Sequence, residues 1–187
     1  MSAVRLLTLG AIRRRGRAHG YQVLADLESW GADEWARATS GSIYHALKTM
    51  TKQGLLLAHD TAPSDVGGPP RMEYEVTDEG AQAYFDLLRA ALTSNDPRLD
   101  LLAAAVGFLD DLPRAEAITL LRQRFQIMAE WRSSITAHLP PDTDLQTWGP
   151  VGEVIDLWLH TADTRAEWTA GLLRRLEHGA HRMAGET

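Results

Sequence analysis

The sequence predicts a mainly α-helical chain with one small β element, and three observations support this fold class. Most of the chain carries apolar residues at the 3.6-residue spacing of amphipathic helices. Strand patterns occur only at residues 55–59 and 72–76, and everything after residue 97 follows helical patterns. The 187 residues, 44% hydrophobic and 24% charged, have an ordinary globular composition, enough for one large domain or two small ones.

Composition also limits the classes of function. There is no cysteine, so neither a disulfide framework nor a thiolate site can form. We expect no membrane partner and a cytoplasmic location, because no apolar run is long enough to span a bilayer or to act as a signal peptide. The net charge of −6 is uneven: residues 1–92 hold ten basic and eleven acidic side chains, and residues 93–187 hold nine and fourteen. The first half can therefore still gather positive charge on one face.

The first half begins with two expected helices. Residues 4–14 form an apolar helix that ends in Arg13, Arg14 and Arg15, where the helix dipole favours positive charge. A second helix follows His19-Gly20, and Gly31 ends it. Its expected apolar face is Tyr21, Leu24, Leu27 and Trp30. Residues 32–39 are expected to be a connector.

Residues 39–57 hold the expected third helix, around which the first half is organised. Ser40 is expected to cap it, and Gly54 to end it in a left-handed conformation. One side is apolar, with Ile43, Ala46, Leu47 and Met50. The other side carries Gly41, Tyr44, His45, Lys48 and Lys52. Leu55, Leu56 and Leu57 then predict a buried strand.

Two expected strands and a fourth helix complete the first half. Met72, Tyr74 and Val76 alternate with glutamates, the pattern of a half-buried strand. Residues 63–71 form a long Pro/Gly-rich loop between the strands. Thr77 is expected to cap a helix with an apolar face at Ala81, Tyr84, Phe85, Leu88 and Leu92. A short amphipathic helix with a basic front, followed by a two-stranded wing, predicts a winged helix-turn-helix.

A domain boundary is expected near residues 94–97, giving domains at 1–94 and 95–187. The second domain contains a short helix at 98–111 and two long helices, from Pro113 to about Leu139 and from Pro150 to about His178. Two helices of roughly 27 residues would each extend roughly 40 Å. Their wide apolar stripes predict a second copy as partner. The expected dimer interface is Val151, Ile155, Trp158, Leu159, Ala162, Leu172 and Leu176. The tail from Gly179 is expected to fray.

Several short motifs of the first half resemble the PadR-type transcriptional regulators. They are HGY at residues 19–21, GSIYHAL at 41–47, KQGLL at 52–56, Arg71 and YEVTDEG at 74–80. Each motif alone is weak, but together they span roughly the first 90 residues in the family's order. The second half resembles the helical dimerisation domain of the longer members.

The resemblance implies a homodimeric repressor that binds inverted-repeat operator DNA, and a possible small aromatic effector. By position it implies DNA contacts from the recognition helix, the second helix and the wing. The residues are Ser40, Ser42, Tyr44, His45, Lys48, Lys52, His19, Tyr21 and Arg71. Two departures stand out: His45 replaces the family's usual proline, and the wing GGPPRMEY is less basic than usual. Fewer basic wing residues predict weaker phosphate binding.

Alternatives remain at several positions. Tyr44 can pack against the second helix, His45 can be merely exposed, and Arg13 to Arg15 can serve the helix end alone. The tryptophans Trp131, Trp148, Trp158 and Trp168 suit a core, an interface or a ligand pocket. A metal site at Asp156, His160 and Asp163 is less expected than a solvated face. We expect no cofactor and no enzymatic activity. The rival function is a winged-helix adaptor that binds a protein instead of DNA.

Overall fold

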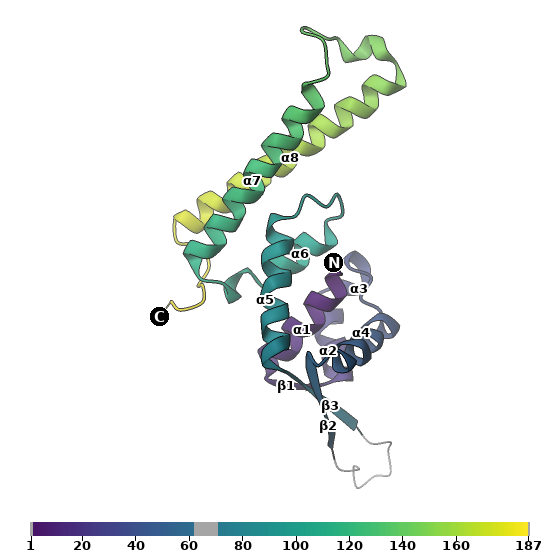
Figure 1. Cartoon of the computed structure of the whole chain (residues 1–187), viewed down its shortest axis with the longest axis vertical. Coiled ribbons are helices and arrows are strands. Elements are labelled where there is room, and N and C mark those ends of the chain that lie inside the picture. The colour runs from purple at the N-terminus through teal and green to yellow at the C-terminus, as the bar shows by residue number, and fades with distance from the viewer. Residues whose placement is uncertain (1, 62–70, 187) are drawn as a thin grey trace. The chain divides into compact units, whose positions relative to one another are not determined.

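The structure, a computed structural model, describes residues 2–61 and 71–186, with only the backbone of Thr61 and Arg71 (Figure 1). The described chain is mainly helical with one small sheet, which confirms the predicted fold class. It divides into two compact units. Unit 1 comprises Met1–Ala91 and Arg98–Phe108, and unit 2 comprises Leu92–Pro97 and Leu109–Thr187. The boundary expected after residue 94 stays a prediction.

Unit 1 contains six helices within the described residues. They are α1 (Ala3–Arg15), α2 (Gly20–Ser29), α3 (Ala32–Trp35), α4 (Ser40–Lys52), α6 (Asp100–Gly107) and α5 (Asp78–Thr93), of which the last two residues belong to unit 2. Their core is apolar and fully buried at Leu6, Leu9, Leu27, Leu47 and Leu88. Gly10 lets α1 approach α6 closely, because a Cβ there would lie 2.3 Å from the Phe108 ring. The expected connector at residues 32–39 contains α3, a single turn too short for a periodic pattern.

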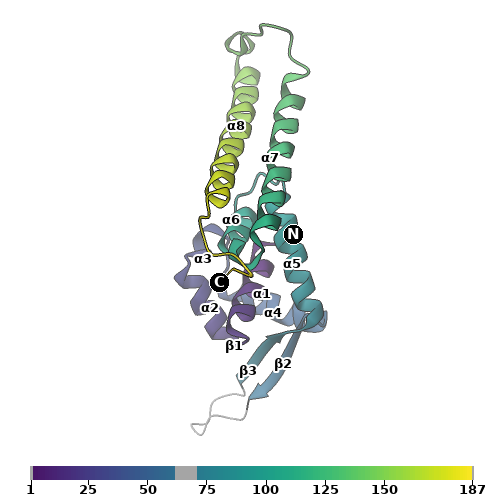
Figure 2. The same cartoon turned by 90° about the vertical axis from the view of Figure 1, so that its left-hand side faces the viewer.

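The sheet of unit 1 is antiparallel, in the order β1-β3-β2 (Figure 2). The strands are β1 (Arg17–His19), β2 (Leu56–Thr61) and β3 (Arg71–Val76). The prediction missed β1, because three residues are too few to show alternation. The prediction of a buried strand from residue 55 was wrong for Leu57. Leu56 is 2% exposed and Leu57 is 53% exposed, as alternation across a sheet requires.

The ends of α4 correct one prediction and confirm another. Thr39, not Ser40, is the N-cap, and its side chain accepts a hydrogen bond from the backbone N–H of Ser42. Gly54 has the expected positive φ of 74°. The N–H of Leu55 donates to the Met50 carbonyl at 2.9 Å, a Schellman closure that turns the chain into β2.

Two further expectations concern α2 and α5. The buried face of α2 is Gly20, Val23 and Leu27, whereas Tyr21 and Trp30 are exposed, so the expected apolar face was partly wrong. Thr77 caps α5 as predicted, because its Oγ1 accepts from the Gly80 N–H at 2.9 Å.

Unit 2 contains an antiparallel pair of long helices, α7 (Arg114–Thr136) and α8 (Pro150–Glu177), with short 3-10 turns η1 (Leu109–Asp111) and η2 (Leu145–Trp148). Leu121 and Met128 of α7 and Leu172 and Leu176 of α8 belong to its core. Proline lies at the first position of α8, where its missing N–H is not needed. No helix in the described chain is long and apolar enough to cross a membrane.

The tail of unit 2 is packed, contrary to the expectation that it frays. Arg114 donates to both carboxylate oxygens of Glu186, at 2.6 and 2.8 Å. The same guanidinium donates to the carbonyls of Leu176 and Ala180, near the end of α8. Met183 is 3% exposed. The tail therefore ties the end of α8 to the start of α7, through pairings distant in sequence.

Candidate nucleic-acid interface

The front of α4 is the candidate interface, and the packing of its back fixes its orientation. Ile43, Leu47 and Met50 are at most 1% exposed, so they anchor α4 in unit 1. The opposite side chains are solvent-exposed: Ser40, Tyr44, His45, Lys48 and Lys52. The helix contains no acidic residue, so this front is positively charged. Such a helix can present hydrogen-bonding and cationic groups to a nucleic-acid groove.

Tyr44 is positioned by a close approach between α2 and α4. A Cβ on Gly20 would lie 2.6 Å from Tyr44 Cε1, so glycine makes room for the ring. Tyr44 is still 45% exposed, and its ring therefore packs on α2 while its surface remains accessible. Burial, and secondly the nearby Tyr44, raise the pKa of Tyr74 on β3. Tyr44 therefore packs against α2, as one of the two alternatives expected, and its contact with DNA stays a prediction.

The first turn of α4 arranges Ser42 through its backbone. The Ser42 Oγ–H donates to the carbonyl of Thr39 at 2.8 Å, which leaves the hydroxyl oxygen as an acceptor. Arg37, in the turn before α4, is exposed and has a φ of 53°. Its carbonyl accepts from the Thr39 N–H at 2.9 Å. This turn sets the angle at which the chain enters α4.

His19 and Tyr21 lie together at the start of α2. Their rings are stacked, with centroids 5.4 Å apart and an interplanar angle of 11°. The His19 side chain and Gln22 form a capping box, in which the His19 N–H donates to Gln22 Oε1 at 2.8 Å. His19 Nδ1 also lies 3.1 Å from the Met72 carbonyl of β3. Tyr21 is 49% exposed, and its ring stacks on His19, the residue that links α2 to β3.

The wing is described only at its base. Residues 62–70 and the side chain of Arg71 are not described by the structure, so the predicted role of Arg71 stays a prediction. At the base, Glu75 accepts a hydrogen bond from His59 at 2.9 Å and pairs with Arg17 at 2.8 Å. The hydrogen bond from His59, followed by the charge of Arg17, lowers the pKa of Glu75. These pairs cross all three strands and brace the wing.

The arginine run at the end of α1 has structural partners in unit 1. Arg13 lies over the Phe85 ring at 4.8 Å, and Arg14 lies over the Phe108 ring at 4.7 Å. Arg15 pairs with Asp26 of α2 at 2.6 Å, and this hydrogen bond raises the pKa of Arg15. These contacts favour the interpretation that the run serves the helix end.

The four C-terminal tryptophans lie in different surroundings. Trp131 is half-buried, and Trp148, Trp158 and Trp168 are 40%, 50% and 41% exposed. Among the described residues, no group of three or more His, Cys, Asp or Glu could hold a metal ion. Asp163 instead accepts from Arg132 at 2.6 Å.

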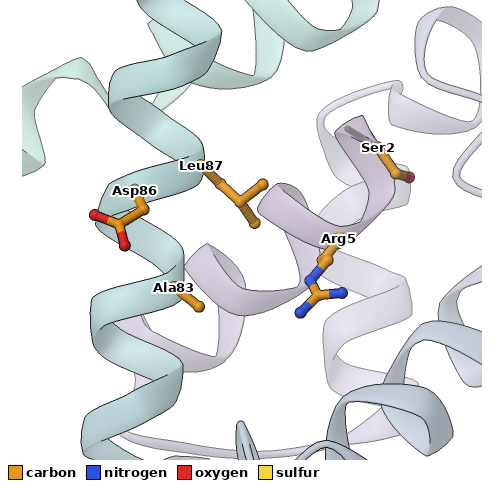
Figure 3. Close-up of a pocket in the computed structure, with 5 residues that line it drawn as sticks. All are labelled: Ser2, Arg5, Ala83, Asp86 and Leu87. Atoms are coloured by element: carbon orange, nitrogen blue, oxygen red, sulfur yellow. The ribbon is translucent and has the colours of Figure 1, made fainter.

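Unit 1 has two cavities lined by other residues. A cavity of about 240 Å³ is lined by Leu7, Arg14, Trp30, Trp35, Ala103, Ala104, Gly107 and Phe108. Sequence reasoning missed this aromatic site because helices far apart in sequence supply its walls. A wider cavity of about 670 Å³ lies between α1 and α5 (Figure 3). There Arg5 and Asp86 point apart, and Asp86 accepts from Gln82.

Comparisons with known proteins agree with this arrangement of the first half. Residues 8–85 match the model of the "Transcriptional regulator PadR-like family". No curated protein matches the chain.

Solved structures with similarity to the chain include Bacillus subtilis PadR in complex with operator DNA, at 19% identity and TM-score 0.42. The match covers 92% of this chain and 98% of that one. The PadR-like regulator BC1756 from Bacillus cereus is 16% identical, with TM-score 0.40 and coverages of 94% and 98%. B. subtilis PadR with p-coumaric acid is 19% identical, with TM-score 0.40 and coverages of 94% and 99%.

Proposed function

We propose that the chain is a homodimeric, ligand-responsive repressor of inverted-repeat operators, because residues 8–85 match the model of the PadR-like family of transcriptional regulators. The observation that carries the proposal is the front of α4. It is exposed, positively charged and free of acidic residues, and its buried back holds it rigidly. A rigid element of this kind can enter a major groove without losing conformational entropy on binding.

In the proposed complex, α4 lies in the major groove and the wing reaches the flanking backbone. Lys48 and Lys52 contact phosphates, because a lysine ammonium is a compact positive charge on a flexible side chain that can reach a phosphate oxygen. Tyr44 and Ser42, near the start of α4, face base edges or sugars. Tyr21 and His19 contact the backbone beside the groove. Arg71 adds a phosphate contact from the wing.

The double variant Lys48→Ala, Arg71→Ala tests this arrangement. Fluorescence anisotropy would measure binding of the full chain to DNA from the promoter of its neighbouring genes, over a range of salt concentrations. Each lost phosphate contact should flatten the slope of log affinity against log salt by about 0.9. The matched control is Arg122→Ala, since Arg122 pairs with Glu177 in unit 2.

Two outcomes would contradict the proposal. One is wild-type binding no tighter than to random DNA at moderate salt. The other is a double variant that binds the operator as the Arg122→Ala control does. Either result would favour the rival function, a winged-helix adaptor that binds a protein.

The dimer is proposed to form through the first half of α8. Val151, Val154, Leu157 and Trp158 are 60%, 44%, 62% and 50% exposed, an apolar surface that a second copy would cover. Of the other predicted interface residues, Ile155 and Leu159 are partly exposed, whereas Ala162, Leu172 and Leu176 are already buried within the protomer. The interface is therefore concentrated near the start of α8.

Leu157→Asp tests the dimer. A carboxylate in an apolar interface is desolvated without a partner, so the variant should be monomeric at concentrations where the wild type is dimeric. Size-exclusion chromatography with light scattering measures the mass. Thr164→Asp, at an exposed position outside the apolar surface, is the control for added charge. A dimeric Leu157→Asp protein would contradict this interface.

Ligand response is the third part of the proposal, and the aromatic cavity of unit 1 supports it. Trp30 packs edge-on against Phe108 with centroids 5.8 Å apart, and Trp35 Nε1 donates to the Trp30 carbonyl at 3.1 Å. These contacts leave about 240 Å³ between flat walls, a volume that suits a small aromatic molecule. A ligand that binds one conformation better shifts the fraction of protein able to bind DNA. Quenching of tryptophan fluorescence by p-coumaric acid, absent in Trp30→Leu, tests this part.

A further inference from the structure

Arg124, in α7, is a buried arginine without a counter-charge. It is only 1% exposed, although arginine is almost never buried unless it is paired. Its Nη1 donates to the carbonyl of Ser94. Its Nε is buried with no hydrogen-bond partner, and no carboxylate in residues 2–61 and 71–186 forms an ion pair with it.

A second guanidinium lies near the first. Arg165 of α8 is half-buried and donates through Nη2 to the carbonyl of Pro97. Burial, and secondly the charge of Arg165, lower the pKa of Arg124. Asn95, between the two carbonyls, also has a buried Oδ1 without a hydrogen-bond partner. The cluster therefore consists of five residues, all of which belong to the compact unit 2: Ser94, Asn95, Pro97, Arg124 and Arg165.

The cluster is electrostatically incomplete. Two like charges lie close enough to interact, Arg124 buried and Arg165 half-buried, and neutral carbonyls are their only described acceptors. A carbonyl dipole offsets part of a charge but does not neutralise it, whereas a carboxylate does and forms shorter, stronger hydrogen bonds with guanidinium. An anion therefore supplies what the cluster lacks.

We propose that Arg124 and Arg165 bind a small carboxylate ligand. The carboxylate would accept from Nε and an Nη of Arg124 side-on and from Arg165 at its other oxygen, replacing the carbonyls of Ser94 and Pro97. The Asn95 amide presents its NH₂ group after a half-turn about the Cβ–Cγ bond. Residues 94–97 lie between α5 and α6. Exchanging the acceptors would therefore break the hydrogen bonds from Arg124 and Arg165 to this connection. The proposal goes beyond the repressor function and stands whether or not the chain binds DNA.

The test uses the full chain and three defined probes: sodium acetate, sodium benzoate and inorganic phosphate, each against sodium chloride at equal ionic strength. Titration calorimetry measures affinity, and thermal unfolding measures the stabilisation that a ligand of the folded state must produce. Arg124→Met removes the charge at nearly constant length, and Arg165→Met removes the second donor. Arg132→Met is the matched control, because Arg132 is exposed on α7 and paired with Asp163.

The expected result is saturable binding of acetate or benzoate to the wild type and to Arg132→Met. Arg165→Met should bind at least about tenfold more weakly, and Arg124→Met should not bind. Without carboxylate, Arg124→Met should unfold at the wild-type temperature or higher, because an unpaired buried charge has been removed. If Arg124→Met does not fold, Arg165→Met decides alone.

Three results would overturn the proposal. The first is a wild type that responds to carboxylates only as it does to chloride. The second is saturable binding of phosphate without binding of acetate or benzoate. The third is an Arg165→Met protein with wild-type carboxylate affinity.

Discussion

Gly20→Ala is expected to weaken operator binding while leaving the fold intact. A Cβ at this position would lie 2.6 Å from Tyr44 Cε1, 3.1 Å from Tyr44 Cζ and 3.3 Å from Leu47 Cδ1, where ordinary contacts begin at 3.4 Å. The Tyr44 ring must therefore move outward by about 1 Å. Because Tyr44 is 45% exposed, the ring can move into solvent without displacing the core.

The free energy of unfolding should change little. Added methyl groups in packed sites typically destabilise a protein by about 1–3 kcal/mol. For Gly20→Ala we expect a cost of about 1 kcal/mol, because the neighbouring Tyr44 ring can move. Alanine in a helix is favoured over glycine by about 0.5–1 kcal/mol, which offsets most of that cost. Operator binding, in contrast, depends on hydrogen-bond distances that a shift of about 1 Å destroys. We expect an increase in Kd of at least about tenfold, or about 1.4 kcal/mol.

The assay is a double-mutant cycle, with Kd from fluorescence anisotropy and stability from urea unfolding. Gly20→Ala and Tyr44→Ala are measured alone and together. If Gly20 acts through the Tyr44 ring, it should have no further effect on Kd once Tyr44 is alanine. Gly107→Ala is the control, because a Cβ there meets nothing within 4 Å. A loss of binding that persists in the Tyr44→Ala background, or no loss at all, would refute this reasoning.

Three further predictions concern stability. Gly80→Ala should destabilise the chain by about 3 kcal/mol in urea unfolding, because its Cβ would lie 2.0 Å from the backbone oxygen of Leu55; a change within 0.5 kcal/mol, about that of a surface substitution, would contradict this. Thr39→Ala should lower the free energy of unfolding by about 1 kcal/mol and Ser40→Ala by much less, since Thr39 is the N-cap. Equal losses would indicate that Ser40 caps the helix as well. The bonds from Arg114 and Met183 lower the pKa of Glu186 from 4.5 to about 2. Its stabilisation should therefore be complete above pH 4.5 and lost toward pH 2. Urea midpoints of wild type and Glu186→Gln should differ at pH 7 and converge in acid, and parallel pH curves would exclude this role.

Local signals in the sequence predicted the helices and the front of α4. The spacing of Ile43, Leu47 and Met50 depends only on the helical period, so it could be recognised without the rest of the chain. Gly54 and Thr77 mark helix ends for equally local reasons, left-handed backbone and capping. For the same reason the exposed Tyr44 and Lys48 could be named as candidates for DNA contact.

Other features could not be predicted because their causes are distant in sequence. The three-residue strand β1 exists only because β3 lies beside it. The tail is held by Arg114, 72 residues before Glu186. The helix-end arginines Arg13 and Arg14 find aromatic partners on α5 and beside α6.

The sequence by itself therefore determined the fold class, the amphipathic α4 and the residues that it exposes, since periodicity and capping act within a few residues. Only the tertiary structure decided which glycine positions Tyr44, which tryptophans line a cavity, and which arginine of α7 is buried without a counter-charge. These properties depend on packing between elements, where one side chain's surroundings are supplied by segments far along the chain.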